Sequence, residues 1–304
     1  MIEIFKDKAF DIEHALVMYA KSFVTMPASF LYEDEQIAPI LDQIAHCHIY
    51  MIGMTPKVAC LGATQDGHDL VTSFEVAGKQ YDLRWPMSVD MALKGDGETG
   101  FYVEDAAGRK SFPTEAMMGQ RLSVEHDAVG FDVLYIGQAF GGDGSRNALD
   151  RLKKHETLQK IAVKGIPEGY VLTILMLAIE PANQLVTMMN PWAKDDTRSS
   201  ERIKKGLDKL FGTNEAERTT LYEASLIRYF QPPFNKEFKN SFPSTNMKVL
   251  ADCYDKDFSA LVAEICIDEL PFRLFSSAAP RTGTGYHFAK HDLHNDETRR
   301  VFFT

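Results

Sequence analysis

The stretch Phe131-Asp132-Val133-Leu134-Tyr135-Ile136-Gly137, near the middle of the chain, has the composition of a β-strand. Its β-branched and aromatic residues lie between two glycines, which is typical of a strand bounded by turns. Residues 121–126 are predicted to form a second strand, and Asp127-Ala128-Val129-Gly130 the turn between the two. The pattern therefore predicts a hairpin at the centre of the chain.

Regular elements follow this hairpin along the chain. Asn147–Ile161 has the apolar spacing of a helix, and Gly169–Ile179 is an apolar run typical of a buried strand. Two more helices are expected over Thr197–Phe211 and Thr219–Phe230, the second ended by Pro232-Pro233.

The N-terminal part has a different pattern. Asp11–Phe23 and Glu35–Ile44 have apolar residues at helical spacing and are predicted as helices. Short strands separated by turn residues are expected at His48–Ile52, Val58–Leu61, Leu70–Val76 and Tyr81–Trp85. The whole chain is therefore predicted to be α+β.

A length of 304 residues suggests about two domains. We expect an N-terminal α+β domain of unknown role at residues 1–120 and a central domain at 121–240. Residues 241–304 are expected to be a C-terminal extension that packs on the other two.

The net charge of −10 is unevenly distributed. Residues 121–240 hold 17 of the 33 Lys and Arg residues against 16 of the 43 Asp and Glu residues, so the central part is close to neutral. A polyanion could bind there while the acidic N-terminal part faces away. Acidic proteins are often simply soluble, so charge alone does not decide the function.

Several features favour a soluble cytoplasmic protein. The N-terminus mixes acids and bases and lacks the apolar run of a signal peptide. The longest apolar stretch, Val171–Ile179, is too short to cross a bilayer, so no membrane partner is expected. The four cysteines form no Cys-x-x-Cys pair and are expected to be reduced thiols.

Three segments of the central part carry residues suited to chemistry. Leu134-Tyr135-Ile136-Gly137-Gln138-Ala139 ends the predicted strand, and Arg151-Leu152-Lys153-Lys154-His155 lies on the next helix. Glu223 begins the third segment, which ends twelve residues later at Pro232-Pro233-Phe234-Asn235.

In this order, the three segments resemble the motifs of the GIY-YIG nuclease family, which includes homing endonucleases, restriction enzymes and an excision-repair subunit. The resemblance covers about residues 120–240 and implies a small antiparallel sheet with flanking helices. It implies a metal-dependent endonuclease that hydrolyses phosphodiester bonds, in DNA first of all, with Mg²⁺ or Mn²⁺. A role in genome defence or restriction is a further expectation from the family.

The resemblance implies a role for each residue, and the chemistry explains it. Glu223 would hold a hard divalent cation. Arg151 would bind the scissile phosphate through its planar fork. Tyr135 would orient or deprotonate the attacking water if a nearby cation lowered its pKa, and Asn235 would orient phosphate or metal-bound water. His155, four residues after Arg151, is expected on the same helix face.

Each of these residues also has a structural alternative. Tyr135 could be an ordinary strand residue and Arg151 a solvated helix residue. Glu223 could be a first-turn residue favoured by the helix dipole. Asn235 could be a turn residue and His155 a core or capping histidine.

The sequence departs from the family in its first motif. Gly-Ile-Tyr is expected about ten residues before Tyr-Ile-Gly, but residues 122–126 are Leu-Ser-Val-Glu-His. Three explanations are open: Tyr135 acts alone, His126 or Glu125 replaces the tyrosine, or the site is impaired. We favour Tyr135 acting alone. An impaired site would make the chain a nucleic-acid-binding or adaptor protein.

A basic helix is a candidate contact for the nucleic acid backbone. Its cations are Arg198, Arg202, Lys204 and Lys205. The alternative is a solvated amphipathic helix with Ile203, Leu207 and Leu210 on the core; homo-oligomerisation stays open.

If the nuclease reading holds, one ion and one phosphate must contact all the reacting groups. The side chains of Tyr135, Arg151, Glu223 and Asn235 should therefore lie within about 10 Å of one another. Their placement on separate faces would argue for the adaptor alternative.

Overall fold

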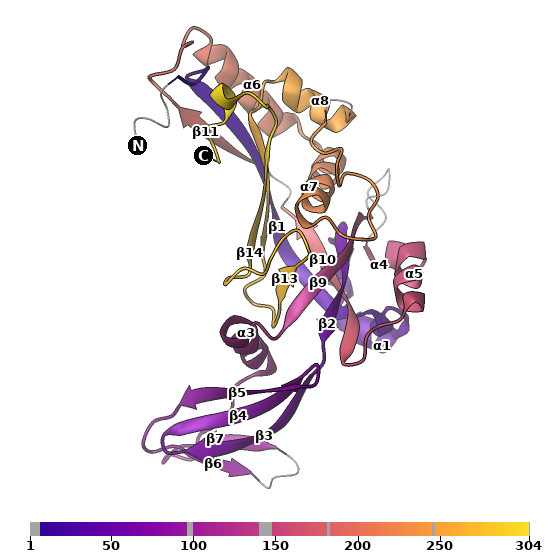
Figure 1. Ribbon diagram of the computed structural model, residues 1–304, viewed down its shortest axis with the longest axis vertical. Helices are drawn as coiled ribbons and strands as arrows, with labels where there is room; N and C mark the ends of the chain where they lie inside the picture. Colours follow the sequence, from indigo (N-terminus) through magenta and orange to yellow (C-terminus); the bar gives the residue numbers. More distant parts are fainter. Residues whose placement is uncertain (1–6, 96–99, 140–147, 181–182, 245–246, 304) are drawn as a thin grey trace.

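The computed structural model describes residues 7–95, 100–139, 148–180, 183–244 and 247–303. Figure 1 shows an elongated molecule, with a large curled sheet through its middle and upper parts and a small-sheet arm at its lower end. The fold is α+β, as predicted from the alternating pattern of strands and helices.

The main sheet has eight strands in the order β13-β9-β2-β10-β1-β12-β14, with β11 also paired to β1. The pairs β1–β12 and β13–β9 are parallel and the other pairs are antiparallel. The strands are β1 (Ile12–Pro27), β2 (Ile49–Pro56), β9 (Gly130–Gln138), β10 (Tyr170–Ile179), β11 (Gln184–Met189), β12 (Ala260–Cys266), β13 (Arg273–Phe275) and β14 (Tyr286–Asp292). The prediction of a small antiparallel main sheet is therefore wrong: the sheet is large and mixed.

This sheet takes strands from all three segments that the sequence analysis separates. β1 and β2 come from residues 1–120, β9 to β11 from residues 121–240, and β12 to β14 from the last 65 residues. The three segments therefore share one hydrophobic core, in which Leu16, Phe131 and Leu261 belong to the same buried cluster.

The long strand β1 shows why the sheet curls. Its second half pairs with β10, whereas its first half pairs with β11 and β12. The register shifts between Ala20 and Ser22, and such irregularities bend a strand and increase its twist. Asp11–Phe23 was predicted as a helix; its apolar residues instead form a strand buried over Ile12–Met18. A short apolar run of this kind does not distinguish a buried strand from a buried helix.

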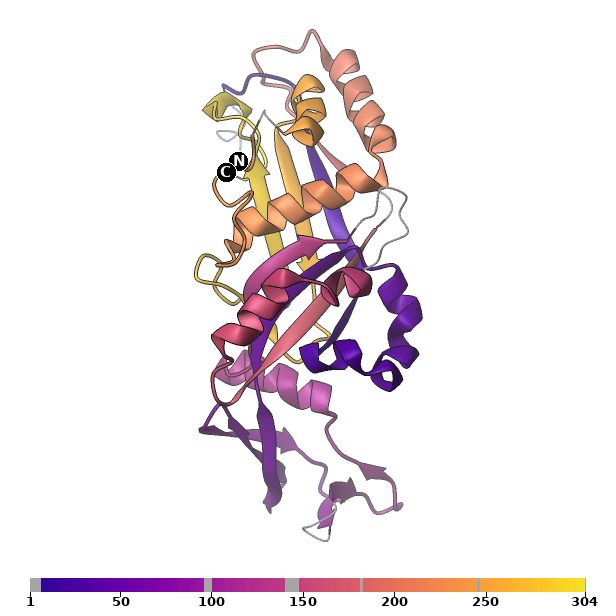
Figure 2. The ribbon, with the colours of Figure 1, turned by 90° about the vertical axis from the view of Figure 1, so that its right-hand side faces the viewer.

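Helices cover the sheet in two groups. α7 (Glu215–Phe230) packs on β9, β12 and β14. Residues of α2 (Leu41–Ala45), α4 (Ala148–Leu152) and α5 (Glu156–Lys164) share a second core cluster with β2 and β10. Figure 2 shows both groups, with α7 crossing the sheet above α5. The short elements nearby are η2 (Ala28–Tyr32), α1 (Asp34–Ile37) and η3 (Ala38–Ile40), with η4 (Glu297–Arg299) near the C-terminus.

An arm of about 70 residues lies between β2 and β9. It contains two three-stranded antiparallel sheets and the helix α3 (Glu115–His126). The strands are β3 (Val58–Asp66), β4 (Asp69–Val76), β5 (Lys79–Pro86), β6 (Ala92–Gly95), β7 (Phe101–Glu104) and β8 (Lys110–Ser111). Figure 1 shows the two sheets side by side below the main sheet.

The predicted hairpin is wrong because residues 121–126 end helix α3. The Thr114 side chain accepts a hydrogen bond from the Met117 backbone N–H and so caps the helix start. Asp127, in the left-handed conformation, ends the helix. Strand β9 was predicted correctly, but it pairs with β2, from which the arm separates it in the sequence.

The helix α6 (Ser199–Gly212) buries charged residues and exposes apolar ones, which is the opposite of the usual burial of an amphipathic helix. Arg202 and Lys209 are buried, whereas Ile203, Leu207 and Phe211 are exposed. The expectation that Ile203 and Leu207 face the core is therefore wrong. Specific partners hold the cations inside: Lys209 forms an ion pair with Asp252 of α8 (Lys248–Asp255), with an N–O distance of 2.7 Å.

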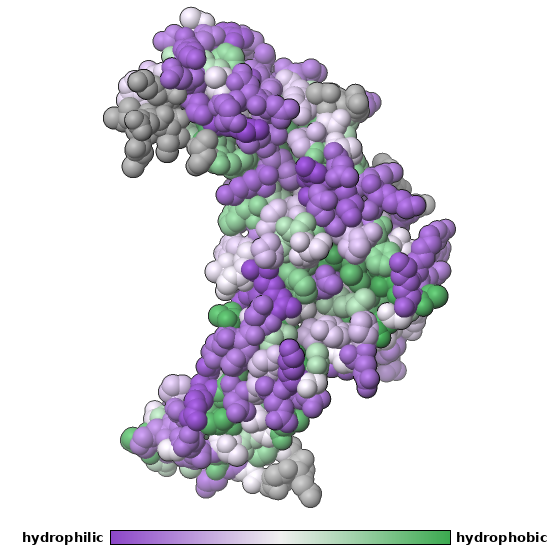
Figure 3. Space-filling view, in the orientation of Figure 1, coloured by the Kyte–Doolittle hydropathy of each residue, from purple (hydrophilic) through white to green (hydrophobic). Residues whose placement is uncertain are grey.

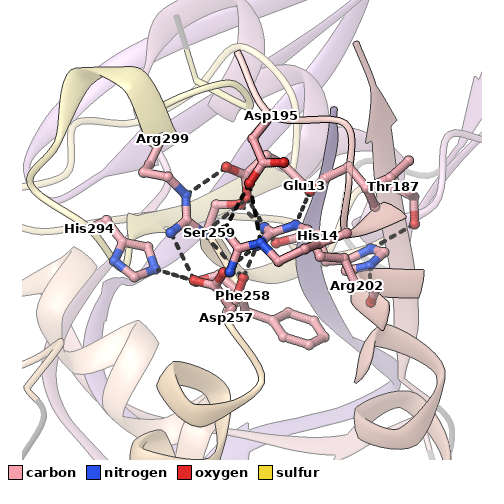
Figure 4. A network of polar contacts seen from close by, with 12 residues as sticks. Glu13, His14, Thr187, Asp195, Arg202, Asp257, Phe258, Ser259, His294 and Arg299 are labelled. Atoms are coloured by element: carbon pink, nitrogen blue, oxygen red, sulfur yellow. Dashed lines mark hydrogen bonds and ion pairs between the residues drawn. The ribbon is translucent and has the colours of Figure 1, made fainter. Parts of the chain in front are cut away.

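A buried ion network joins α6 to both ends of the described chain (Figure 4). The carboxylate of Glu13 on β1 accepts hydrogen bonds from Arg202 at 2.7 Å and from Arg299 at 2.6 Å. Asp257 pairs with the same two arginines. Because Glu13 is 1% exposed and all its charge is matched, the network fixes how α6 and the C-terminal segment lie on β1.

Both ends of the molecule are mainly hydrophilic in the space-filling view, and hydrophobic surface gathers in the middle over β9 and β10 beside α5 (Figure 3). Among the described residues, no helix is long and apolar enough to cross a membrane.

The ion network gives a stability prediction. Removing one partner of a buried ion pair leaves an unpaired charge, which costs about 3–5 kcal/mol. We expect Arg299→Leu to lower the free energy of unfolding by this amount in denaturant titrations. The control is Arg300→Leu, whose side chain is 35% exposed and whose loss should cost less than about 1 kcal/mol. Equal losses in the two variants would contradict the proposed role of the network.

Candidate functional site

The pairing of β2 with β9 brings two tyrosines together. Tyr50 lies opposite Gly137, and Ile52 lies opposite Tyr135, so the tyrosines are diagonal neighbours on one face of the sheet. Their ring centroids are 6.2 Å apart. Tyr50 is fully buried and Tyr135 is half-buried, so the two rings lie at the floor of a surface pocket and not at its rim.

Gly137 is required by this packing. A Cβ atom at Gly137 would lie 2.6 Å from Cζ and Oη of Tyr50 and 2.8 Å from Cε1 of Tyr135. These separations are far below a normal contact between carbon atoms. The glycine of the Tyr-Ile-Gly motif is thus the position that lets both rings lie over the strand.

His155 packs against both tyrosines. Its ring centroid lies 4.9 Å from that of Tyr135 and 5.5 Å from that of Tyr50. His155 caps α5, because its Nδ1 accepts a hydrogen bond from the Leu158 backbone N–H. Burial lowers its pKa, with a smaller effect from Arg151, so the ring is neutral with its proton on Nε2. The capping alternative for His155 is therefore correct, in a position that also supports the tyrosines.

Arg151 and His155 do not share one helix. Arg151 lies in the last turn of α4, which ends at Leu152, and His155 is the N-cap residue of the next helix, α5. The predicted helix over residues 147–161 is thus two short helices, of which residue 147 lies outside the described range. Arg151 donates a hydrogen bond to the Tyr50 hydroxyl, and its charge acts on Tyr135 and Glu223.

Glu223 is a buried carboxyl group in the middle of α7. The helix begins at Glu215, so Glu223 is two turns inside it and the first-turn alternative is excluded. It is 8% exposed, and burial raises its pKa to about 8, with a further contribution from Glu237. The backbone N–H of Gln138 and the charge of Arg151 act in the opposite direction. Such a perturbed carboxyl group facing a cavity is typical of a functional site.

Asn235 holds the segment after α7 against β9. Its Oδ1 accepts a hydrogen bond from the Ile136 N–H at 2.9 Å, and its Nδ2 donates one to the Ile136 carbonyl at 2.8 Å. The Phe234 N–H also donates to the Leu134 carbonyl. Through these two hydrogen bonds the Asn235 amide positions the Tyr-Ile-Gly strand.

These side chains line one pocket of about 1290 Å³. Tyr135, Arg151, Glu223 and Asn235 all contribute to it, as their predicted convergence requires, and Tyr50 joins them. One wall is formed by α5 and the other by residues 233–238.

Burial disfavours the deprotonated form of both tyrosines in the metal-free protein. Burial raises the pKa of Tyr135, and Glu223 adds to the effect more than Arg151 opposes it. Burial also raises the pKa of Tyr50. The charge of Arg151 lowers the pKa of Tyr135, as expected of a nearby cation, but burial and Glu223 outweigh this effect in the metal-free protein. Both phenols stay protonated at neutral pH, where they can donate hydrogen bonds to a phosphate or a water molecule.

The candidates for replacing the missing tyrosine lie elsewhere. His126 contacts the Asp82 carbonyl and the Tyr81 ring, and Glu125 pairs with Arg121; all are in or beside the arm. Neither residue lines the pocket. The residue that sequence reasoning missed is Tyr50, in His48-Ile49-Tyr50. Its signal was the Ile-Tyr pair shared with the family's first motif, 85 residues before Tyr135 instead of about ten.

One of the four cations predicted to contact nucleic acid on α6 is not accessible. Arg202 is buried in the ion network, so it cannot reach a ligand. Arg198 pairs with Asp195 and Lys205 with Glu201. Lys204 is exposed, but none of the four cations lines the pocket.

Two carboxyl groups of the pocket, Glu223 and Glu237, could together hold a hard divalent cation. No group of three or more His, Cys, Asp or Glu residues that could hold a metal occurs in the part of the chain that the structure describes. Glu223 and Glu237, however, act on each other across the pocket, and burial disfavours the charged form of Glu223. A cation that keeps several waters, as Mg²⁺ does, needs only one or two carboxylates.

Comparisons of the chain with protein-family models, with curated proteins and with solved structures find no match. The interpretation of the pocket therefore depends on its residues and their geometry.

Replacing Gly137 tests the packing of the two tyrosines. In Gly137→Ala, the added methyl group must displace Tyr50 or Tyr135, which we expect to cost about 1–3 kcal/mol of unfolding free energy. Gly212→Ala is the control, because a Cβ atom there meets nothing within 4 Å. A Gly137→Ala variant as stable as the Gly212→Ala variant would show that the rings do not depend on this glycine.

The raised pKa of Glu223 links stability to pH in the metal-free protein. Between its ordinary value of 4.5 and about 8, the unfolded chain releases this proton and the folded chain keeps it. Glu223 therefore makes its full contribution to the free energy of unfolding below pH 4.5, its ordinary pKa in the unfolded chain. This contribution is lost as the pH rises to about 8. We expect the unfolding free energy, relative to Glu223→Gln, to fall by on the order of 4 kcal/mol from pH 4.5 to 8 in EDTA. Parallel pH profiles for the two proteins would contradict this.

Proposed function

We propose that the chain is an endonuclease that hydrolyses phosphodiester bonds, with DNA as its expected substrate and Mg²⁺ or Mn²⁺ as its metal. The observation that carries the proposal is that Tyr50, Tyr135, Arg151 and Glu223 come from four separate segments and line one pocket. A guanidinium, a buried carboxyl group and two hydroxyl groups are the groups that hydrolysis of a phosphate diester uses.

The resemblance to the GIY-YIG nucleases supports this proposal at both tyrosines. β9, β2 and β10 are neighbouring antiparallel strands within the larger sheet. His48-Ile49-Tyr50 lies at the start of the strand beside Tyr135, as the family's first motif is expected to do. We therefore treat these three strands, with α4, α5 and α7, as a GIY-YIG-like unit into which the arm is inserted.

Each residue of the pocket has a distinct task in this mechanism. Arg151 binds the scissile phosphate through its paired N–H donors and stabilises the charge that develops on the phosphate oxygens. The hydroxyl groups of Tyr50 and Tyr135 orient the attacking water and the phosphate. His155 packs against both rings and Asn235 holds the strand of Tyr135, so both are positioning residues.

Glu223 would hold the metal, with Glu237 as a second carboxylate near it. When bound, the ion would relieve charge on the phosphate and lower the pKa of a bound water. Glu223 itself must release its proton for this, which the cation favours.

The adaptor alternative depended on the missing first tyrosine. Tyr50 supplies a tyrosine beside Tyr135, which supports the nuclease over the adaptor alternative. A setting in genome defence or restriction is proposed from the family resemblance alone.

Glu223→Gln tests the proposed function. The amide keeps the shape of the side chain but removes the charge that binds a hard cation. We expect Mg²⁺-dependent cleavage of plasmid DNA to fall by at least about 100-fold, with an unchanged circular dichroism spectrum. Glu201→Gln, on the exposed side of α6, is the control and should cleave as the unmodified protein does. Equal cleavage by both variants would show that Glu223 is not a metal ligand.

A further inference from the structure

The two walls of the pocket carry lysines that the proposed chemistry does not use. Lys160 and Lys164 of α5 and Lys236 of the opposite wall are exposed and line the pocket. The reacting groups on the floor are Tyr50, at 1% exposure, and Glu223, at 8%. The pocket is therefore a groove with a buried floor, and its rim carries these three lysines beside the exposed carboxylates of Glu156 and Glu237.

α5 is oriented so that its polar face forms one wall. Leu158 and Ile161 point into the second core cluster, whereas Lys160 and Lys164, one turn apart, face the groove. Lys160 has only an exposed partner, Glu156, at 3.5 Å, a pair that contributes little to stability. Its ammonium group can therefore move to a phosphate at small cost.

Lys164 connects the two walls. Its Nζ lies 4.7 Å from the ring centroid of Phe234, which belongs to the opposite wall. A phosphate of a bound strand can replace the Phe234 ring as the partner of the Lys164 ammonium group. The Phe234 ring is then free to stack on a base.

The size of the groove favours a polymer. Its volume of about 1290 Å³ exceeds the range of about 300–1,000 Å³ that is usual for small-molecule sites.

We propose that the groove between α5 and residues 233–238 binds one nucleic acid strand, with its phosphates on Lys160, Lys164 and Lys236. This replaces α6 as the nucleic acid contact and rests on the proposed function. The strand can come from single-stranded nucleic acid or from one edge of a duplex, since the phosphodiester chemistry is the same.

The test measures binding without cleavage. Fluorescence anisotropy of a labelled single-stranded DNA, and of the same sequence as a duplex, is recorded in EDTA over a range of salt concentrations. For Lys160→Gln with Lys164→Gln, we expect affinity to fall by about tenfold or more and the salt slope to decrease by roughly 1.4–1.8. The matched control is Lys204→Gln with Lys205→Gln on α6, which should bind as the unmodified protein does.

The outcomes separate this proposal from the proposed function. Unchanged affinity and salt slope in the α5 variant, or equal losses in both variants, would overturn the groove assignment even if the protein cleaves DNA. The expected lysine dependence without any metal-dependent cleavage would keep the groove assignment and overturn the nuclease. The DNA probe that binds more tightly, single-stranded or duplex, identifies the source of the strand.

Discussion

The candidate site depends on one contact, the packing of the Tyr50 and Tyr135 rings over Gly137 where β2 pairs with β9. The other groups are arranged around these rings. Arg151 bonds the Tyr50 hydroxyl, and His155 packs on both rings. Any shift of register between the two strands would separate the tyrosines and remove the floor of the pocket.

Local sequence patterns predicted the parts of the site that lie on single elements. β9, β10 and α7 have clear apolar patterns, and the motif residues Tyr135, Arg151, Glu223 and Asn235 meet at one pocket. Spacing along the sequence could not identify Tyr50, because the arm separates β2 from β9 in the chain. The two strands become neighbours only when the arm folds as a separate unit. Sequence separation says nothing about strand pairing when a folded unit is inserted.

The helix α6 shows a second limit of sequence patterns. Its apolar and charged residues lie on opposite faces, as in an ordinary amphipathic helix, and this pattern does not state which face is buried. Here the buried face includes Arg202 and Lys209, because Glu13, Asp257 and Asp252 supply matched carboxylates. These partners are far from α6 in the sequence, so only the tertiary structure shows that Arg202 is unavailable to a ligand.

The insertion of the arm also has a consequence for the order of folding. Ile52 and Tyr135 are paired across 83 positions of the chain. Closing a loop of that length costs about 2 kcal/mol more in chain entropy than closing a ten-residue hairpin. The arm pairs its own strands over short separations, for example Asp66 with Asp69, so it can form early and shorten the remaining loop. We therefore expect the two tyrosine strands, and the pocket floor that they form, to come together only after the arm has formed.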